Sequence, residues 1–365
     1  MEDRPIKFAK GPFHAELRKR VDAYIAPLPG EGRDDPRMFV KAVVILSWFA
    51  TSWALLVFWA HSWPVALALS ASLGFATAGI GFNLMHDGSH GAFSRFPIVN
   101  RVMALSLELL GGSSFIWRWK HNVNHHSFPN ILGIDHDLEV GPWARMAPHQ
   151  ASKPFHRFQQ FYMWGLFGLL PFKWYMLDIS NYRKNTVGAQ KLPPRELPEK
   201  LVFLSGKIIM PLWALAIPML FHNPAIVLLF YFTSFFVTGV VMSTTFLLAH
   251  CVDEAQVAQP INGRLDTEWA AHQIETAVDF AQGSRLACWF MGGLNFQIEH
   301  HLFPQISHVH YPKIAPIVRE VCAKYGVRYT ARPTVLGAIA AHFRWLERMG
   351  RGEPAMLSAV TRRAA

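Results

Sequence analysis

Four apolar stretches arranged in two pairs dominate the pattern of the chain. Residues 42–60 are apolar almost without interruption, and residues 65–85 form a second run after the short turn 61–64. The stretches 202–221 and 225–249 meet in the same way at the turn 222–224. About 20 apolar residues in a helix cross a hydrocarbon core of about 30 Å. The pattern therefore predicts four transmembrane helices, with close packing where the second contains glycine (Gly74, Gly79 and Gly81).

The polar segments between and around these pairs carry most of the histidines. Residues 87–200 are polar, and their apolar pieces at 102–110 and 161–170 are too short to be spans, which indicates interfacial or re-entrant helices. We expect an all-α integral membrane protein in which a helical cap bears the histidine clusters. The expected organisation is an N-terminal segment 1–38, a membrane domain 39–330 and a C-terminal tail 331–365.

Positive charges predict which side of the membrane the cap occupies. Neither of the two tight turns, 61–64 and 222–224, contains a lysine or arginine, whereas the terminal segments and both long loops do. The positive-inside rule then places both termini and both loops in the cytoplasm. On this topology His86, His250 and residues 297–301 all lie on the cytoplasmic face.

The composition of the chain indicates which classes of molecule it can bind. The chain is 51% hydrophobic and 16% charged, with a formal net charge of +10, which favours an anionic leaflet, phosphate-bearing substrates or an acidic protein partner. Nucleic acid is not expected, because no basic run with interleaved aromatics occurs. Cys251, Cys288 and Cys322 form no Cys-x-x-Cys pair, so neither a disulfide framework nor a thiolate metal site is indicated.

Three histidine clusters have the spacing of metal ligands on helices. Side chains at i, i+3 and i+4 leave the same face of a helix and can share one ion. One histidine, His250, stands alone at the end of the fourth apolar stretch. The clusters are His86 and His90; His121, His125 and His126; and Gln297, His300 and His301.

The ligand types indicate the metal. Imidazole-rich, carboxylate-poor coordination suits iron, copper or zinc and excludes a dedicated magnesium or calcium cage. Zinc needs only three or four ligands, so eight histidines and one glutamine predict two iron ions with room for dioxygen. Carboxylates are then expected behind the ligands, orienting imidazole N–H groups. The candidates are Asp87, Asp135, Asp137 and Glu299.

Each feature also has a simpler interpretation. A single His-x-x-x-His pair more often packs or faces solvent than binds metal, and His250 can sit at a helix end for solvation alone. His136, His272, His308 and His310 are expected at the surface or behind the ligands. Phe115, Trp117 and Trp119 either line an acyl tunnel or, more commonly for such residues, form an interfacial aromatic belt.

The clusters resemble the three histidine boxes of the membrane-bound fatty acid desaturase family. Box one is residues 86–90, box two is residues 121–126 and box three is residues 297–301, preceded by Gly-Gly-Leu-Asn-Phe at 292–296 and followed by Leu-Phe-Pro at 302–304. Most of the family has histidine at the first position of box three, where this chain has Gln297. A glutamine at this position resembles the front-end subgroup, which includes bacterial linoleoyl-CoA and acyl-lipid desaturases.

The resemblance implies the reaction and its requirements. Two non-haem iron ions, dioxygen and two electrons would insert a cis double bond between the carboxyl end and an existing double bond, at the delta-6 or delta-5 carbon of an acyl-CoA or acyl-lipid. The sequence has no His-Pro-Gly-Gly haem motif, so a separate donor of the ferredoxin or cytochrome b5 type is expected. The implied location is a bacterial inner membrane in preference to the endoplasmic reticulum.

Two other functions fit parts of the pattern. An enzyme on the same scaffold could hydroxylate the acyl chain or convert a double bond to an alkyne. A membrane metal transporter or receptor is the alternative from a different class. Transporters place ligands near the bilayer midplane, whereas the clusters here lie at the ends of the apolar stretches.

Overall fold

The structure is a computed structural model that describes residues 6–135, 141–188 and 190–355. It divides into two compact units. The bundle unit comprises residues 34–122 and 164–244, and the terminal unit comprises residues 1–33, 123–163 and 245–365. Each unit is described by itself.

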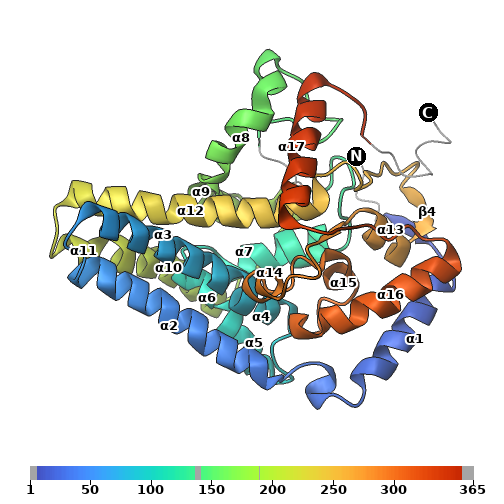
Figure 1. Cartoon of the computed structure of the whole chain (residues 1–365), viewed down its shortest axis with the longest axis horizontal. Coiled ribbons are helices and arrows are strands. Elements are labelled where there is room, and N and C mark those ends of the chain that lie inside the picture. The colour runs from blue at the N-terminus through green and yellow to red at the C-terminus, as the bar shows by residue number, and fades with distance from the viewer. Residues whose placement is uncertain (1–5, 136–140, 189, 356–365) are drawn as a thin grey trace. The chain divides into compact units, whose positions relative to one another are not determined.

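Four long apolar helices define the bundle unit, as the pattern predicts (Figure 1). Each is long and apolar enough to cross a membrane. Helix α12 ends in the terminal unit, to which its last turn belongs. The four are α2 (Pro36–Phe58); α3 (Trp63–Ile80), continued by η2 (Gly81–Met85) and α4 (His86–His90); α10 (Leu197–Pro211), continued by η6 (Leu212–Ala216) and α11 (Ile217–Met219); and α12 (Pro224–His250).

These helices begin earlier than the apolar runs indicate. A proline occupies the first turn of each, where its missing N–H costs no hydrogen bond. Asp35 caps α2 by accepting from the backbone N–H of Arg37 at 2.9 Å. The first turns of α2 and α10 carry polar residues, which is why hydropathy alone misses them. The second span also runs past residue 85, through box one to His90.

Close packing inside the bundle is confirmed at Gly74. A Cβ there would lie 2.5 Å from the backbone oxygen of Ser234, so only glycine permits this approach of α3 to α12. The Thr238 hydroxyl donates to the Gly74 carbonyl at 3.0 Å. Lys207, a charged residue in the apolar part of α10, donates to the Gly111 carbonyl at 2.6 Å and pairs with Asp178 at 3.4 Å.

The short apolar pieces form short helices and are not candidate spans. Ile98 and Val102 on α5 are exposed, as expected for an interfacial helix. The short helices are α5 (Pro97–Ala104), α6 (Ser106–Leu109), α7 (Ser114–Trp117), η3 (Arg118–His125), η5 (Pro154–Phe158), α8 (Gln159–Phe167) and α9 (Leu170–Lys184).

The terminal unit is built around one apolar core shared by four helices. Leu17, Ile274, Ile298 and Val318 are buried together in it, one from each of α1, α13, α15 and α16. Box three therefore lies on a helix whose other face is in the core. The helices of the unit are α1 (Phe13–Ile25), α13 (Trp269–Glu275), α14 (Arg285–Phe290), α15 (Gln297–Leu302), α16 (Tyr311–Tyr325) and α17 (Val335–Arg351), with short turns η1 (Pro29–Glu31) and η7 (His308–His310).

The expected all-α class agrees with the described residues, which are mostly helical and also contain short strands. Three two-stranded sheets join extended segments whose backbone groups would otherwise lack partners. They pair β1 (Lys7–Ala9) with β4 (Arg264–Glu268), β2 (Thr186–Val187) with β3 (Gln190–Lys191), and β5 (Asp279–Phe280) with β6 (Ala331–Arg332).

Candidate metal centre

Box one lies where the second long helix changes its winding. The π-helical turn η2 leads directly into α4, which carries His86 and His90 with ring centroids 4.8 Å apart. Such turns are frequent at functional sites because they shift the register of the side chains that follow. A Cβ on Gly88 would lie 2.6 Å from the Met103 side chain, so a glycine lets α4 pack tightly on α5.

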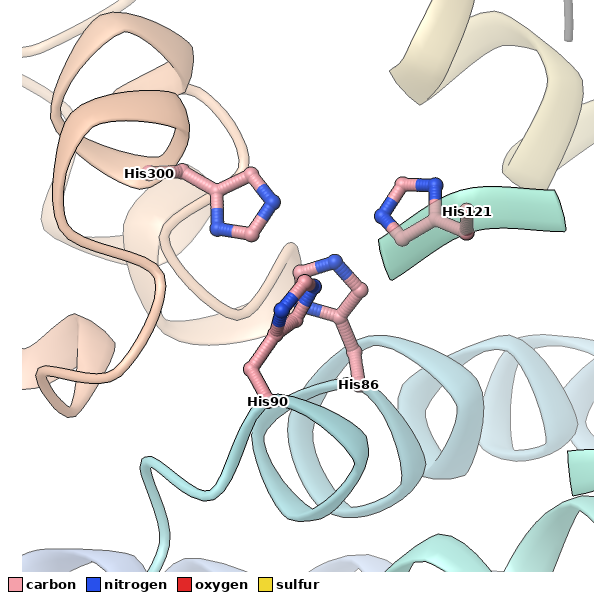
Figure 2. Close-up of side chains that lie close together, drawn as sticks. All are labelled: His86, His90, His121 and His300. Atoms are coloured by element: carbon pink, nitrogen blue, oxygen red, sulfur yellow. The ribbon is translucent and has the colours of Figure 1, made fainter. Parts of the chain in front are cut away.

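His121 completes a group of three imidazoles in the bundle unit. Its ring centroid lies 5.4 Å from that of His86 and 5.5 Å from that of His90, and Figure 2 shows the ring turned toward the pair on α4. The ligand nitrogens of the three lie within 4.8 Å of one another. His300, also drawn in Figure 2, belongs to the terminal unit and is described with it. We call His86, His90 and His121 the bundle group.

Two contacts hold His121 in place. The Trp117 ring stacks on its imidazole with centroids 4.6 Å apart and planes at 28°. The Asn122 side chain donates to the Ser89 carbonyl at 2.7 Å, which ties box two to box one. Trp117 is only 7% exposed. Of the two interpretations of its sequence position, the interfacial belt is therefore wrong for this residue.

A second group of three imidazoles lies in the terminal unit. His125, His250 and His301 come from box two, the end of α12 and box three, and their ligand nitrogens lie within 4.8 Å of one another. All three side chains are buried. We call them the terminal group.

Each ring of the terminal group is oriented through its Nδ1 atom. The Nδ1 atom of His125 lies 2.9 Å from a carboxylate oxygen of Asp135, that of His250 lies 3.1 Å from the Thr276 carbonyl, and that of His301 lies 2.9 Å from the Gln273 amide oxygen. All three partners are acceptors, so the proton of each neutral ring sits on Nδ1. The lone pair is therefore on Nε2 in every case.

This arrangement fits a metal ion. The Nε2 atoms of His250 and His301 lie 3.1 Å apart, and with both protons on Nδ1 two lone pairs face each other. A cation between them relieves that repulsion. Neutral imidazoles anchored through the other ring nitrogen are the usual form of histidine ligands. The nitrogen donor set suits iron, copper or zinc.

The remaining candidates of boxes two and three lie beside the terminal group. The His126 ring stacks on His301 with centroids 4.5 Å apart and meets His300 edge-on at 4.6 Å. Gln297 places its amide nitrogen 3.0 Å from His250 Nε2, and its buried Oε1 atom has no hydrogen-bond partner among the described residues. A half-turn of the amide exchanges the two ends, so its oxygen can face the group.

The four carboxylates that were expected behind the ligands differ in their contacts. Asp135 contacts His125 as expected, and Asp87 lies 4.0 Å from His86 Nδ1, beyond hydrogen-bond range. Glu299 instead contacts the Tyr329 hydroxyl at 3.0 Å. Burial raises the pKa of Glu299 well above its usual range, and the neighbouring Asp279 charge raises it further. Asp137 lies outside the described residues.

Three other histidines are buried and not at the surface. His272 donates from Nε2 to the Pro129 carbonyl at 2.9 Å, and burial lowers its pKa to about 4, so it stays neutral. His308 and His310 are 1% and 6% exposed. His136 lies outside the described residues.

Sequence reasoning missed the two neutral acceptors of the terminal group. Gln273 lies on α13 and Thr276 acts through its backbone carbonyl, so neither has a spacing that marks it. Asn130 also escaped notice, although its side chain donates to the carbonyls of His250 and Thr276. These residues contact the ligands because of the three-dimensional fold, and their spacing in the sequence does not reveal it.

The fold and these groups define a helical membrane protein with candidate sites for transition metals. The chain belongs to the fatty acid desaturase family, whose sequence profile, described as "Fatty acid desaturase", matches residues 61–333. It is therefore an oxidoreductase that acts on fatty acyl chains.

Curated relatives cover nearly the whole chain. The chain is 38% identical to an sn-1 linoleoyl-lipid 6-desaturase of Synechocystis over 95% of its length and 98% of the relative. It is 35% identical to a protein of the same name from Arthrospira platensis, covering 92% of each. An acyl-lipid (8-3)-desaturase of Physcomitrium patens is 35% identical over 93% of the chain and 72% of the relative. The family resemblance is confirmed.

Proposed function

We propose that the protein is a di-iron desaturase that inserts a cis double bond at the front end of an unsaturated acyl chain on a membrane lipid. The observation that carries the metal part is the terminal group, in which three acceptors fix the protons of His125, His250 and His301 on Nδ1. Family membership makes the enzyme the better interpretation than a metal transporter or receptor.

Each histidine group is proposed to hold one iron ion. The bundle group would supply three imidazoles to one ion, and the terminal group would supply three to the other, with His126, His300 and Gln297 beside it. Iron held by these residues would supply the oxidising power, with dioxygen, that the removal of hydrogen from unactivated methylenes requires. Overall, the acyl chain gives up two hydrogen atoms, the donor gives two electrons, solvent gives two protons, and dioxygen is reduced to two waters.

The residues of the chain have defined tasks in this proposal. Asp135, Gln273 and the Thr276 carbonyl hold three imidazoles in the tautomer that can bind metal. Burial of the site keeps bulk water from the reactive centre. A methylene chain offers no polar handle, so its position relative to the histidines must come from the shape of the apolar path it follows.

The substrate and location are proposed from the relatives. Two of them act on linoleoyl-lipids at carbon 6 by name, which favours an acyl-lipid over acyl-CoA and the delta-6 over the delta-5 position. A multi-pass protein of a bacterial inner membrane with its site on the cytoplasmic face is proposed, together with a separate ferredoxin or cytochrome b5 type donor. The net charge of +10 suits an acidic donor.

An experiment in which cells are fed linoleate tests the proposed desaturation reaction. Cells that express the protein and receive linoleate, with iron and a donor present, should accumulate a new triunsaturated acid in their glycerolipids, as gas chromatography of separated lipid classes would show. A new product found only in the acyl-CoA pool would overturn the acyl-lipid assignment. A hydroxylated acid in its place would support the hydroxylase alternative, and no new product would contradict the front-end proposal.

Gln297→His tests the role assigned to box three. We expect the variant to retain iron but to shift the position of the double bond, because Gln297 contacts His250 at the edge of the terminal group. The product profile and the iron content report on the two roles separately. Unchanged regioselectivity with unchanged iron content would show that Gln297 contributes to neither.

A further inference from the structure

A buried polar cluster lies behind box three, with the Tyr329 hydroxyl at its centre. That hydroxyl donates to Asp279 Oδ2, lies 3.0 Å from Glu299 Oε1 and accepts from the Gln282 amide at 2.8 Å. Asp279 and Glu299 are both fully buried. These contacts have no task in the proposed desaturation reaction.

The helix that carries box three cannot hold its own orientation. Helix α15 has only six residues, and its N-cap residue, Phe296, has non-helical dihedral angles and no capping side-chain bond. Isolated helices of this length are not stable in water. The direction in which α15 presents its side chains therefore depends on contacts with the rest of the terminal unit.

Glu299 lies on the opposite side of α15 from the candidate ligands. With 3.6 residues per turn, Gln297, His300 and His301 fall within an arc of about 100°, and Glu299 lies about 150° from its middle. The contact from Tyr329 to Glu299 thus fixes the back of the helix whose front bears the ligands.

A second contact fixes the start of the helix. Asp279 Oδ1 accepts the backbone N–H of Ile298 at 2.9 Å, which is one of the N–H groups that a helix leaves unpaired in its first turn. Because Tyr329 and Gln282 both donate to the other oxygen of Asp279, they set the orientation of this carboxylate. Tyr329 therefore contacts α15 directly at Glu299 and acts on it indirectly through Asp279, which accepts from the N–H of Ile298.

The cluster is in turn anchored to neighbouring segments. Gln282 accepts from the Arg319 guanidinium on α16, and Asp279 on β5 pairs with Ala331 on β6, two residues beyond Tyr329. Three segments, which are residues 279–282, helix α15 and the segment of Tyr329, therefore meet at one hydroxyl group, and α16 joins them through Arg319.

We propose that Tyr329 is a positioning residue for the metal site, which holds α15 so that His301 faces the terminal group, with Gln297 and His300 on the same side of the helix. This inference rests on the proposed function, since it takes the box-three residues as ligands. A misplacement of about 1 Å in a reacting group typically costs about 100-fold in rate. Loss of the hydroxyl should therefore lower kcat by about 10- to 100-fold and leave KM for the acyl-lipid within about twofold.

Tyr329→Phe removes the hydroxyl and keeps the ring, and Tyr325→Phe is its matched control. Tyr325 ends α16, packs edge-on against Phe13, and has no hydrogen bond from its hydroxyl within the described part of the chain. Two readouts besides turnover separate the variants. These are amide hydrogen exchange of the peptide 297–302 in the metal-free protein and the visible absorption of the cobalt-substituted protein.

We expect exchange at 297–302 to be about tenfold faster in Tyr329→Phe than in Tyr325→Phe, because a hydrogen bond to a buried carboxylate is lost. The cobalt absorption should shift in Tyr329→Phe alone. If Tyr329→Phe fails to fold, Gln282→Ala, which removes two donors at the edge of the cluster, should give smaller changes in the same direction.

The proposal is overturned if both readouts match the Tyr325→Phe control. Wild-type protein that takes up no cobalt would contradict the proposed metal function itself, because that result does not depend on Tyr329. Faster exchange in Tyr329→Phe would then assign the cluster to folding alone, which also overturns its role in positioning ligands.

Discussion

Different kinds of contact surround the two histidine groups. In the terminal group, hydrogen bonds from Nδ1 to Asp135, Thr276 and Gln273 fix the rings. In the bundle group, His86 and His90 are placed by helical spacing on α4, and His121 by the stacked ring of Trp117. Asp135, Thr276 and Gln273 are thus the contacts to test in the terminal group, and Trp117 is the contact to test in the bundle group.

These two kinds of contact should contribute different amounts to metal binding. An acceptor on the far ring nitrogen fixes the tautomer and strengthens the ligand, and its loss typically costs 10- to 100-fold in metal affinity. An aromatic contact contributes about 0.5–1.5 kcal/mol, or about 2- to 10-fold. Loss of an Nδ1 acceptor in the terminal group should therefore weaken metal binding more than loss of the Trp117 ring in the bundle group.

The largest effect should follow loss of a ligand from the terminal group. His125→Ala removes one of three imidazoles, and we expect no measurable desaturation while the protein remains folded in detergent. Product formation in membranes and the thermal unfolding profile check the two parts. Full turnover by a folded His125→Ala protein would remove the terminal group from the mechanism.

Asp135→Asn should weaken the terminal site without removing a ligand. The carboxylate accepts from His125 Nδ1 and from the backbone N–H of Asn130, and an amide satisfies both less well. We expect iron affinity at the terminal site to fall by about 10- to 100-fold, as measured by competition with a chelator. Equal loss of both ions would show that the two groups do not fill independently.

A buried carboxyl in the bundle unit should make stability depend on pH. Burial raises the pKa of Glu108 to about 7, although the Ser114 N–H and O–H groups donate to it and favour the charged form. Burial also raises the pKa of Asp178 to about 6, against the opposing effect of Lys207. Both groups hold protons more tightly in the folded state than in the unfolded state.

Because the folded state binds the extra protons, stability should fall as pH rises from about 4.5 to about 7 and then level off. For Glu108 the change amounts to about 2–3 kcal/mol. Glu108→Gln, which keeps the shape of the side chain, should flatten most of this slope in thermal unfolding measured between pH 5 and pH 8. A slope identical to that of the wild type would contradict the assignment to Glu108.

The smallest effect should come from the aromatic contact of the bundle group. Trp117→Leu removes the ring stacked on His121, and we expect a 2- to 10-fold loss of affinity for the ion of the bundle group, about 0.5–1.5 kcal/mol. Trp117→Phe is the matched control and should recover most of the loss. A Trp117→Leu effect as large as that of Asp135→Asn would abolish the distinction between the two groups.

Local pattern was sufficient to predict the long helices and the histidine clusters. Runs of apolar residues predict spans directly, and the i, i+4 spacing places His86 and His90 on one face. The pattern left two interpretations open for Trp117, because a tryptophan before a histidine cluster looks the same in sequence whether it faces lipid or an imidazole. Its burial depends on packing that no local window contains.

The acceptors behind the ligands were only partly predictable. Asp135 could be proposed because a carboxylate near box two is a plausible partner for imidazole. Thr276 acts through a backbone carbonyl, a group present at every position, and so leaves no mark in the sequence. Glu299 is adjacent to the ligands along the chain, yet helical geometry turns it toward Tyr329.

Iron content of purified protein tests the central claim most directly. The account predicts about two iron ions per chain in the wild type and in the control His61→Ala, whose residue lies exposed in a turn, and about one in either His121→Ala or His125→Ala. Mössbauer spectra of the wild type should show two distinct iron environments. One zinc ion per chain, or two iron ions retained in both ligand variants, would contradict it.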